Sequence, residues 1–423
     1  MRESLTNVAP IGKSGRRPNR GAGMQASVDG AELAPRRLGL TLPLAMGAGP
    51  ISLYALSALS PLVIDELHLS RSQLGSLATV TFVVGAVGSM AAARATNTFG
   101  SRYVLVALFV AAGLAVGIVA AARSLLWLFV GVAVSGWAQS MSNPATNDLI
   151  SVFVPSPRQG VLIGIKQSGV QMSQFLAGIA LPTAALILGW RGAIAITATL
   201  AFAGWGLTLR GVPRLASASH THGEQHQRLP FEVWWLSGYM FLMAAALQAT
   251  NVYLPLFSYQ RLGFGTTTAG LTVAAVGGMG LLARIFWGRV SGQAGNSRTL
   301  LMGMAVASVI AAVLLLGAQT TGRAWWVWAA ATLDGTTAVA ANVVVVVTVI
   351  RWMDRRTVST ASGVLAVAMY LGFAVGPLSF GLLVDDFGGY TAAWTAVGIV
   401  YAAAAVVIII WQRLVPTVRA SAQ

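Results

Sequence analysis

The sequence predicts an all-α membrane protein with twelve transmembrane helices, arranged as two six-helix bundles related by pseudo-symmetry. Composition is the first reason, because 56% of the residues are hydrophobic and only 9% are charged, whereas charged residues make up about a quarter of a soluble protein. The second reason is the presence of twelve apolar runs long enough to cross a hydrocarbon core about 30 Å thick. The third is that the second half of the chain repeats the first at an offset of about two hundred residues.

The apolar runs are continuous rather than alternating, so they predict helices and not the strands of a β-barrel. In chain order, the expected spans cover residues 41–63, 72–93, 103–122, 125–149, 160–187, 191–209, 233–257, 268–290, 299–318, 325–350, 358–383 and 391–411. These spans divide the chain into a disordered cytoplasmic tail, two bundles joined by a cytoplasmic linker, and a second tail. The five segments are expected at residues 1–40, 41–209, 210–232, 233–412 and 413–423, with the linker as the third.

The internal repeat can be followed at individual positions. Three pairs of identical residues stand 199 positions apart, namely Asn143 and Asn342, Gly164 and Gly363, and Gly189 and Gly388. Each half runs through two spans, a basic hairpin, two spans, a basic loop and two further spans. Two like-handed halves around a central cavity form one of the few plans that alternate access to a site near the bilayer midplane. The repeat therefore predicts a transporter.

The formal net charge of +15 is distributed unevenly over the predicted loops. With the N-terminus in the cytoplasm, the external loops hold five arginines and the internal segments hold twenty-one basic residues. This positive-inside asymmetry orients both termini toward the cytoplasm. Basic residues spread over loop ends do not form a groove-binding surface, so no nucleic-acid partner is expected. The preference for arginine over lysine favours a bacterial source, and hence a multi-pass protein of the inner membrane, expected as a monomer.

Neither a cofactor nor a metal is expected. The chain contains no cysteine, which excludes disulfides, thiolate ligands and a cysteine nucleophile. His220, His222 and His226 lie in the linker without neighbouring carboxylates, so we interpret them as solvated loop residues. The spans hold no histidine and no His-Glu-x-x-His motif, so an enzyme is not expected. A phosphate-binding loop is also absent, which argues against ATP-driven transport by this chain alone.

Among the ionisable residues inside predicted spans, where charge is costly and therefore indicates function, three are candidates for the transport site. Asp334 lies six residues after Trp328, about 9 Å along the helix axis, and is the expected proton carrier. The alternative for Asp334 is a neutral, hydrogen-bonded acid that packs helices. Lys166 and Arg284 are expected to attract an anionic substrate. Their alternatives are a lysine that snorkels to the interface and an arginine that anchors the cytoplasmic end of its span.

Polar side chains on the same helical faces complete the expected substrate site. They form two pairs, one helical turn apart or nearly so, namely Gln248 with Asn251 and Gln167 with Gln171. Such pairs inside apolar helices either line a cavity or make interhelical hydrogen bonds. We also expect Lys166 and Asp334 to pair across the cavity in one state of the transport cycle, which would couple substrate binding to protonation.

Over residues 40–412 the chain resembles the major facilitator superfamily. The hairpin after span two carries Ala93, Asn97, Gly100 and Arg102, with Asn97 where that family has an aspartate. The second copy carries Gly288, Gly292, Gly295 and Arg298 and also lacks the aspartate. The resemblance implies that Asn97, Gly100, Arg102, Gly288, Gly295 and Arg298 belong to gating hairpins. The stretch NPATNDLISVFVPSPRQGVLIGIKQSGVQ, from residue 143, is similar to bacterial permeases grouped with cyanate and related small-anion carriers.

One arginine position of that family bears on the substrate. Anion-carrying nitrate/nitrite relatives place an arginine four residues before the first glycine of the second hairpin, and Arg284 stands four residues before Gly288. The matching arginine of the first half is missing, since Ser89 stands four residues before Ala93. This departure argues against a nitrate carrier that uses paired arginines.

Taken together, these features predict a secondary active transporter, most simply a symporter, that moves a small organic or inorganic anion by alternating access with proton coupling. A drug/proton antiporter that expels cationic or neutral compounds is the nearest alternative. The expected cavity holds more cationic than anionic side chains, and this disfavours cationic substrates. A membrane receptor that keeps the same fold without transporting is the other alternative, which solute flux in proteoliposomes would exclude.

Overall fold

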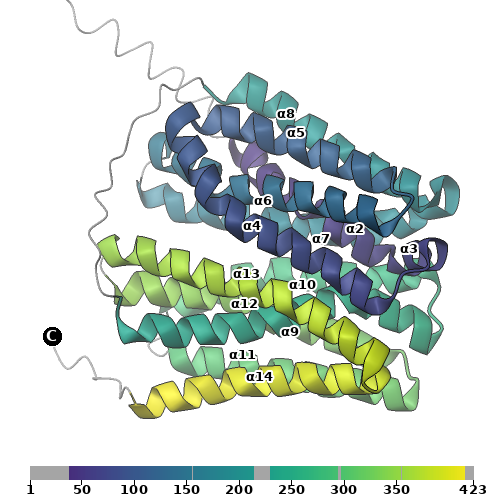
Figure 1. Cartoon of the computed structure of the whole chain (residues 1–423). Coiled ribbons are helices and arrows are strands. Elements are labelled where there is room, and N and C mark those ends of the chain that lie inside the picture. Colours follow the sequence, from purple (N-terminus) through teal and green to yellow (C-terminus); the bar gives the residue numbers. More distant parts are fainter. Residues whose placement is uncertain (1–37, 155, 214–228, 294–296, 354, 415–423) are drawn as a thin grey trace, which may run out of the picture.

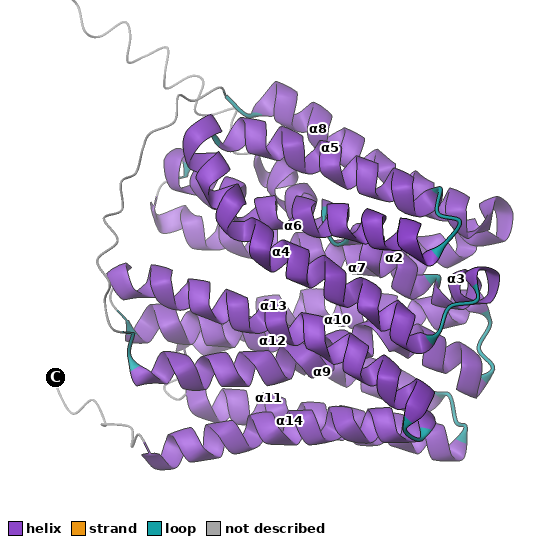
Figure 2. Cartoon of the chain, in the orientation of Figure 1, coloured by secondary structure: helices purple, strands orange, loops and turns teal. Residues whose placement is uncertain are grey.

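The computed structural model describes residues 38–154, 156–213, 229–293, 297–353 and 355–414. Within these ranges the chain is helical throughout, apart from short connections (Figure 2). Most of the expected tails and of the expected linker lies outside the described residues. A helical segment Leu38–Ala48 comes first. It is followed by α2 (Ile51–Ala58), α3 (Ser60–Leu67), α4 (Arg71–Phe99), α5 (Ser101–Ala120), α6 (Leu125–Phe153), α7 (Ser156–Ile196), α8 (Ala198–Gly211), α9 (Phe231–Leu262), α10 (Thr266–Gln293), α11 (Ser297–Thr321), α12 (Trp325–Trp352), α13 (Arg355–Asp386) and α14 (Gly389–Leu414).

The helices form two layers that lie side by side with their long axes roughly aligned (Figure 1). Helices α2 to α8 make one layer and α9 to α14 make the other (Figure 1). We call the two ends of the molecule the Arg71 end, where α4 begins, and the Arg102 end, where α5 begins. The C-terminal ends of α8 and α14 and the N-terminal end of α9 all lie at the Arg102 end (Figure 1).

Local sequence explains where α4 begins and ends. The Ser70 hydroxyl accepts from the Gln73 amide at 3.1 Å, while the Ser70 amide donates to the Gln73 side chain at 2.9 Å. This reciprocal pair is a capping box, which satisfies two backbone amides at a helix start. The helix ends at Gly100, whose φ of +85° is strained for any residue with a Cβ.

The first expected span, residues 41–63, is bent in the structure. The segment Leu38–Ala48 and α2 meet at an angle of 56°, and α3 then follows as a separate helix. Pro50 lies at the break and has no N–H to donate to the preceding turn. Gly49 also packs against the backbone of Gln139 on α6, where an added Cβ would lie 2.7 Å from its Cα.

Gly189 divides a second long element. The stretch Val161–Gly211 is 51 residues long, about 77 Å at 1.5 Å per residue, which is more than twice the thickness of a hydrocarbon core. Gly189 has a φ of +65° inside α7, so the chain turns between the expected spans 160–187 and 191–209. Its repeat partner Gly388 also has a positive φ, +106°, between α13 and α14.

Ten helices in the described part of the chain are long and apolar enough to cross a membrane, or eleven if the bent first pair counts as one span. Because the turn at Gly189 divides one of these ten, the total is consistent with twelve crossings. The protein is therefore a multi-pass membrane protein.

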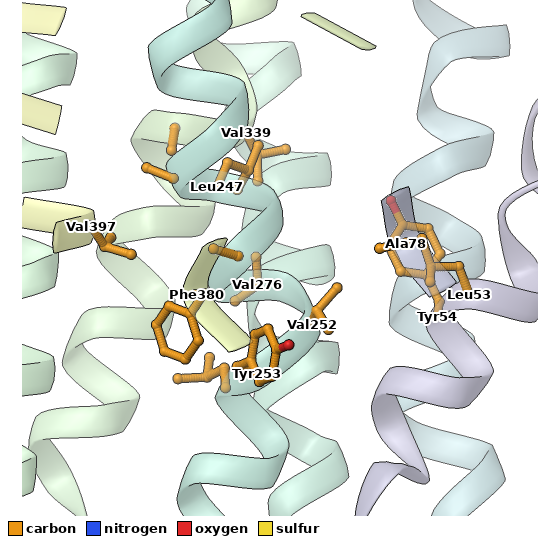
Figure 3. Close-up of a cluster of buried hydrophobic side chains, with 14 of the residues drawn as sticks. Leu53, Tyr54, Ala78, Leu247, Val252, Tyr253, Val276, Val339, Phe380 and Val397 are labelled. Carbon is orange, nitrogen blue, oxygen red and sulfur yellow. The ribbon is translucent and has the colours of Figure 1, made fainter. Parts of the chain in front are cut away.

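Glycines allow the two layers to approach closely. An added Cβ at Gly178 of α7 would lie 2.4 Å from the Ala274 amide of α10. At Gly75 of α4 it would lie 2.3 Å from the Pro377 carbonyl of α13. Small residues at such crossings bring helix backbones together in membrane proteins. Within the second layer, Tyr253 and Phe380 stack with their ring centroids 4.5 Å apart, opposite Tyr54 and Leu53 of the first layer (Figure 3).

Candidate functional site

A cavity of about 110 Å³, lined by both apolar and polar side chains, lies between the two layers. Helices α2, α4, α6 and α7 line it from the first layer, and α9, α10, α12 and α13 line it from the second. Its polar lining consists of Tyr54, Gln139, Ser142, Asn143, Gln167, Gln171, Gln248, Asn251, Arg284, Asn342 and Tyr370. No aspartate or glutamate lines the cavity among the described residues, and Arg284 supplies its positive charge.

The structure brings together five of the six residues that the sequence nominated for substrate binding. They are Gln167, Gln171, Gln248, Asn251 and Arg284, and each lines the cavity. Asn251 also forms a hydrogen bond with a neighbouring helix. The Asn251 side chain accepts from Gln174 at 3.0 Å, which links α9 to α7 across the two layers. The predicted binding residues of α7, α9 and α10 therefore line the same cavity.

Arg284 reaches from α10 toward α7. Its Nη1 donates to the Gln167 carbonyl at 3.1 Å, and its Nε is buried without a hydrogen-bond partner in the described part of the chain. Gly280, one helical turn earlier, lets α10 approach α7 and α12, since an added Cβ there would lie 2.6 Å from Val339. The guanidinium thus retains donor capacity at the cavity wall.

Three glutamines at the cavity wall also retain unused polar atoms. Gln139 Oε1, Gln171 Oε1 and Gln248 Nε2 are buried, and none of them has a hydrogen-bond partner among the described residues. A buried polar atom without a hydrogen-bond partner costs about 1–3 kcal/mol of folding stability. Most buried polar atoms in native proteins are therefore hydrogen-bonded. Several such atoms around one cavity indicate a site that a polar ligand or water completes.

Lys166 does not line the cavity. Its side chain is 1% exposed, and its Nζ donates to Asn143 Oδ1 at 3.2 Å, to Thr146 Oγ1 at 3.1 Å and to Asn147 Oδ1. These three acceptors use all three N–H donors of an ammonium group. Lys166 therefore lies between α7 and α6 behind Asn143, and it does not snorkel to an interface.

Asp334 lies inside the second layer, outside the cavity lining, and is 1% exposed. Tyr401 of α14 donates to its Oδ1 at 2.7 Å, and its Oδ2 has no described partner. Lys166 and Asp334 do not pair in this structure, because each side chain is held by partners within its own layer.

The described residues assigned to the two hairpins lie toward the Arg102 end. Asn97 is exposed near the end of α4, and Gly100 separates α4 from α5. Arg102 Nη2 donates to the Leu209 carbonyl of α8 at 2.9 Å.

In the second hairpin, Gly288 lies within α10, and Gly295 lies outside the described residues. The guanidinium of Arg298 stands 4.4 Å from the Trp411 ring centroid and 5.5 Å from that of Trp352. Both basic residues thus tie their hairpins to the last helix of the same layer.

Sequence reasoning missed several cavity residues, most notably Gln139 and Asn143 on α6 and Asn342 on α12. A signal for the last two was present, because Asn143 and Asn342 are partners in the repeat. Gln139 lies four residues before Asn143 and so shares its helical face. Tyr54 and Tyr370 carried no such signal, since single aromatic residues in apolar helices are common.

The chain is similar to two bacterial transport proteins. The chain is 27% identical over 374 residues to the "Probable nitrate/nitrite transporter NarK2" of Mycobacterium tuberculosis (strain ATCC 25618 / H37Rv), which covers 81% of this chain and 89% of that protein. It is 22% identical over 248 residues to the "Nitrite extrusion protein" of Bacillus subtilis (strain 168). That match covers 55% of this chain and 59% of the Bacillus protein.

Solved structures share the fold at low identity. A bacterial homologue of the human lysosomal transporter Spinster, in an inward-facing and occupied conformation, has a TM-score of 0.69 at 16% identity, covering 94% of this chain and 98% of its own. A mutant of the nucleoside transporter NupG has a TM-score of 0.70 at 12% identity, covering 89% of this chain and 99% of its own. The model of one family, described as Major Facilitator Superfamily, matches residues 44–344. The chain therefore belongs to the major facilitator superfamily.

Proposed function

We propose that this protein is a secondary active transporter of a small anion, and that nitrate and nitrite are the first compounds to test. The observation that carries the proposal is the charge of the cavity, which Arg284 lines and no described carboxylate enters. A cation with an unused donor in a largely desolvated space favours an anion that accepts hydrogen bonds. The names of the two relatives agree with this chemistry, since both concern nitrate or nitrite.

Cavity size and charge also argue against the drug/proton antiporter. Drug-sized ligands occupy pockets of about 300–1,000 Å³, whereas this cavity holds about 110 Å³. A cationic drug would also lack a counter-charge, because no acidic residue lines the cavity among the described residues. The first-half arginine of nitrate carriers remains replaced by Ser89, which does not line the cavity. We therefore propose an anion site built on one cavity arginine rather than two.

The transport cycle that we propose is alternating access by two six-helix bundles. The bundles would correspond to residues 41–209 and 233–412, joined by the linker at 210–232, with twelve crossings in total. The Arg102 end would face the cytoplasm, since the positive-inside rule places both tails there. The two layers would rock about the central cavity as a monomer.

We further propose that Asp334 carries the coupled proton. The support is its burial, the absence of a described cation beside it, and its unpartnered Oδ2. Tyr401 of α14 donates to the carboxyl, and α14 packs against α9, the helix that presents Gln248 and Asn251 to the cavity. Movement of α9 on substrate binding would thus alter the surroundings of the carboxyl.

Counterflow of nitrate and nitrite into proteoliposomes that contain the purified protein tests the substrate class. Wild-type protein is expected to exchange at least one of these anions, and Arg284→Gln to weaken its binding about ten- to hundredfold, the value of a charged hydrogen bond. Arg289→Gln is the matched control, because Arg289 is an exposed arginine on the same helix outside the cavity lining. Absence of anion exchange in wild-type proteoliposomes, or equal effects of the two substitutions, would contradict the proposal.

A further inference from the structure

The polar cluster around Lys166 occurs in one repeat and not in the other. Lys166, Thr146 and Asn147 have Leu365, Val345 and Val346 at the positions 199 residues later. Burial is matched across the repeat, since Lys166 is 1% exposed and Leu365 4%, while Thr146 is 0% exposed and Val345 1%. Val345 and Leu365 belong to the hydrophobic core. The fold therefore needs only apolar contacts at these positions, and the buried ammonium of the first repeat requires another explanation.

Asn143 is the one member of the cluster that both repeats keep and that reaches the cavity. Asn143 and its repeat partner Asn342 both line the cavity. Lys166 is an obligatory donor, so the group of Asn143 that faces it must be the carbonyl oxygen, at 3.2 Å. This fixes the orientation of the amide and leaves its NH₂ group as a donor without a described partner.

The charge of Lys166 has no carboxylate partner in the described part of the chain. Its three acceptors are neutral side-chain oxygens. A buried charge balanced only by dipoles is costly, and a nearby opposite charge lowers that cost. An anion in the cavity, one side chain away from the ammonium, would supply that charge.

We propose that Asn143 donates its side-chain NH₂ to the transported anion and that Lys166 is a positioning residue, which holds this amide with its donors toward the cavity. The inference rests on the proposed anion transport and identifies the contact that the first layer makes, opposite Arg284 of the second. The ligand class is a small anion with acceptor oxygens and no hydrogen to donate. Lys166 contributes its positive field but no direct hydrogen bond, because all three of its donors are used.

Substitution of Asn143 by aspartate separates a binding role from a structural one. The carboxylate is nearly isosteric, and it would bind Lys166 more strongly than the amide does. The aspartate also presents an acceptor to the cavity where the asparagine presents its NH₂ donor, and its negative charge neutralises the positive charge of Lys166. Calorimetric titration of purified Asn143→Asp with nitrite and nitrate should show a loss of affinity of at least about thirtyfold, with the melting temperature unchanged or raised. A merely structural tie between α6 and α7 would leave the affinity unchanged.

The positioning role of Lys166 is tested by a double-mutant cycle. Lys166→Met alone should weaken binding about tenfold, because it frees the amide to rotate. Lys166→Gln should retain part of the affinity, since its NH₂ can still donate to the Asn143 oxygen. In an Asn143→Ala background, Lys166→Met should lower the affinity by much less than about tenfold. If the two residues acted independently, the affinity losses of the single variants would multiply in the double variant. Asn342→Ala provides the matched control. Asn342 is the repeat partner of Asn143, and the residue that corresponds to Lys166 in its repeat is Leu365, which cannot donate a hydrogen bond.

The outcomes distinguish this inference from the proposed function. A wild-type protein that binds neither nitrite nor nitrate would overturn anion transport and the inference with it. A wild-type protein that binds one of them while Asn143→Asp binds equally well would overturn the inference alone. If the affinity losses of Asn143→Ala and Lys166→Met multiplied fully in the double variant, the positioning role of Lys166 would be overturned. The two residues would then contribute to binding independently.

Discussion

Asp385, in the last turn of α13, accepts a hydrogen bond from the backbone amide of Ser72, in the first turn of α4, at 2.7 Å. The same carboxylate lies 3.7 Å from the Arg71 guanidinium. A carboxylate at a helix N-terminus is favoured by the free amides and by the helix dipole. Here the carboxylate and the amides come from opposite layers, so this contact ties the two layers together at the Arg71 end. Any state that opens the Arg71 end must break it.

Removing the contact of Asp385 with Arg71 and Ser72 should make the interface between the layers more accessible to solvent. The chain has no cysteine, so Thr79→Cys introduces a single thiol beside Ala374, whose carbonyl accepts from Thr79 at 2.5 Å. We expect Asp385→Ala to raise the rate at which a maleimide alkylates that thiol several-fold, since the contact is worth about 1 kcal/mol. Asp386→Ala, at the exposed neighbouring carboxylate, should leave the rate unchanged. An equal rate in all three proteins would mean that other contacts close this end.

Proton coupling through Asp334 predicts a separation of two transport modes. Asp334→Asn should abolish accumulation driven by a pH gradient and should spare exchange of substrate, because an amide can accept from Tyr401 but cannot cycle a proton. Both modes are measured in the same proteoliposome preparation, with and without the gradient. Accumulation that persists in the variant would place the coupled proton at another residue.

Close helix packing predicts opposite results at two glycines. An added Cβ at Gly376 of α13 would lie 1.9 Å from the Ala245 carbonyl of α9, whereas one at Gly117 of α5 would meet nothing within 4 Å. Gly376→Ala should therefore lower the unfolding free energy by about 1–3 kcal/mol or more. Gly117→Ala should leave it unchanged or raise it by up to about 1 kcal/mol, since alanine favours helix. Thermal melting of the two purified variants checks the contrast, and similar melting temperatures would contradict the packing.

A pH-dependent contribution to stability is expected at Glu66, between α3 and α7. The Arg191 guanidinium and the Trp190 indole N–H donate to its carboxylate and hold the pKa of Glu66 below its usual value of 4.5. Because the folded pKa is the lower one, the contribution is present above pH 4.5 and disappears as the pH falls through the folded pKa. The carboxylate is half exposed, so the contribution stays below about 1 kcal/mol.

Glu66→Gln should accordingly lower the melting temperature at neutral pH, and its difference from wild type should shrink as the pH is lowered below about 4. Asp65→Asn is the control, since Asp65 is an exposed carboxylate on the same helix. A difference between Glu66→Gln and wild type that does not change with pH would show that the carboxylate contributes no charge-dependent stability.

The sequence alone determined the class of this protein, because hydrophobic content, span length and repeat order are all properties of the linear chain. Same-face spacing on single helices also identified Gln167, Gln171, Gln248 and Asn251, since the helical period fixes which residues share a face. The cost of burying charge singled out Arg284. These inferences concern one helix at a time, and for that reason they could be made without knowing the neighbours.

Only the tertiary structure decided what each residue meets across helices. Lys166 and Arg284 are both cations in apolar spans, yet one is saturated by three acceptors of α6 and the other lines the cavity. Asn143 lines the cavity because α6 packs against α7. Asp385 links the two layers because α13 lies next to α4. Spacing along one chain carries no information on which helices pack together or how they are rotated, and these two quantities decide which groups meet.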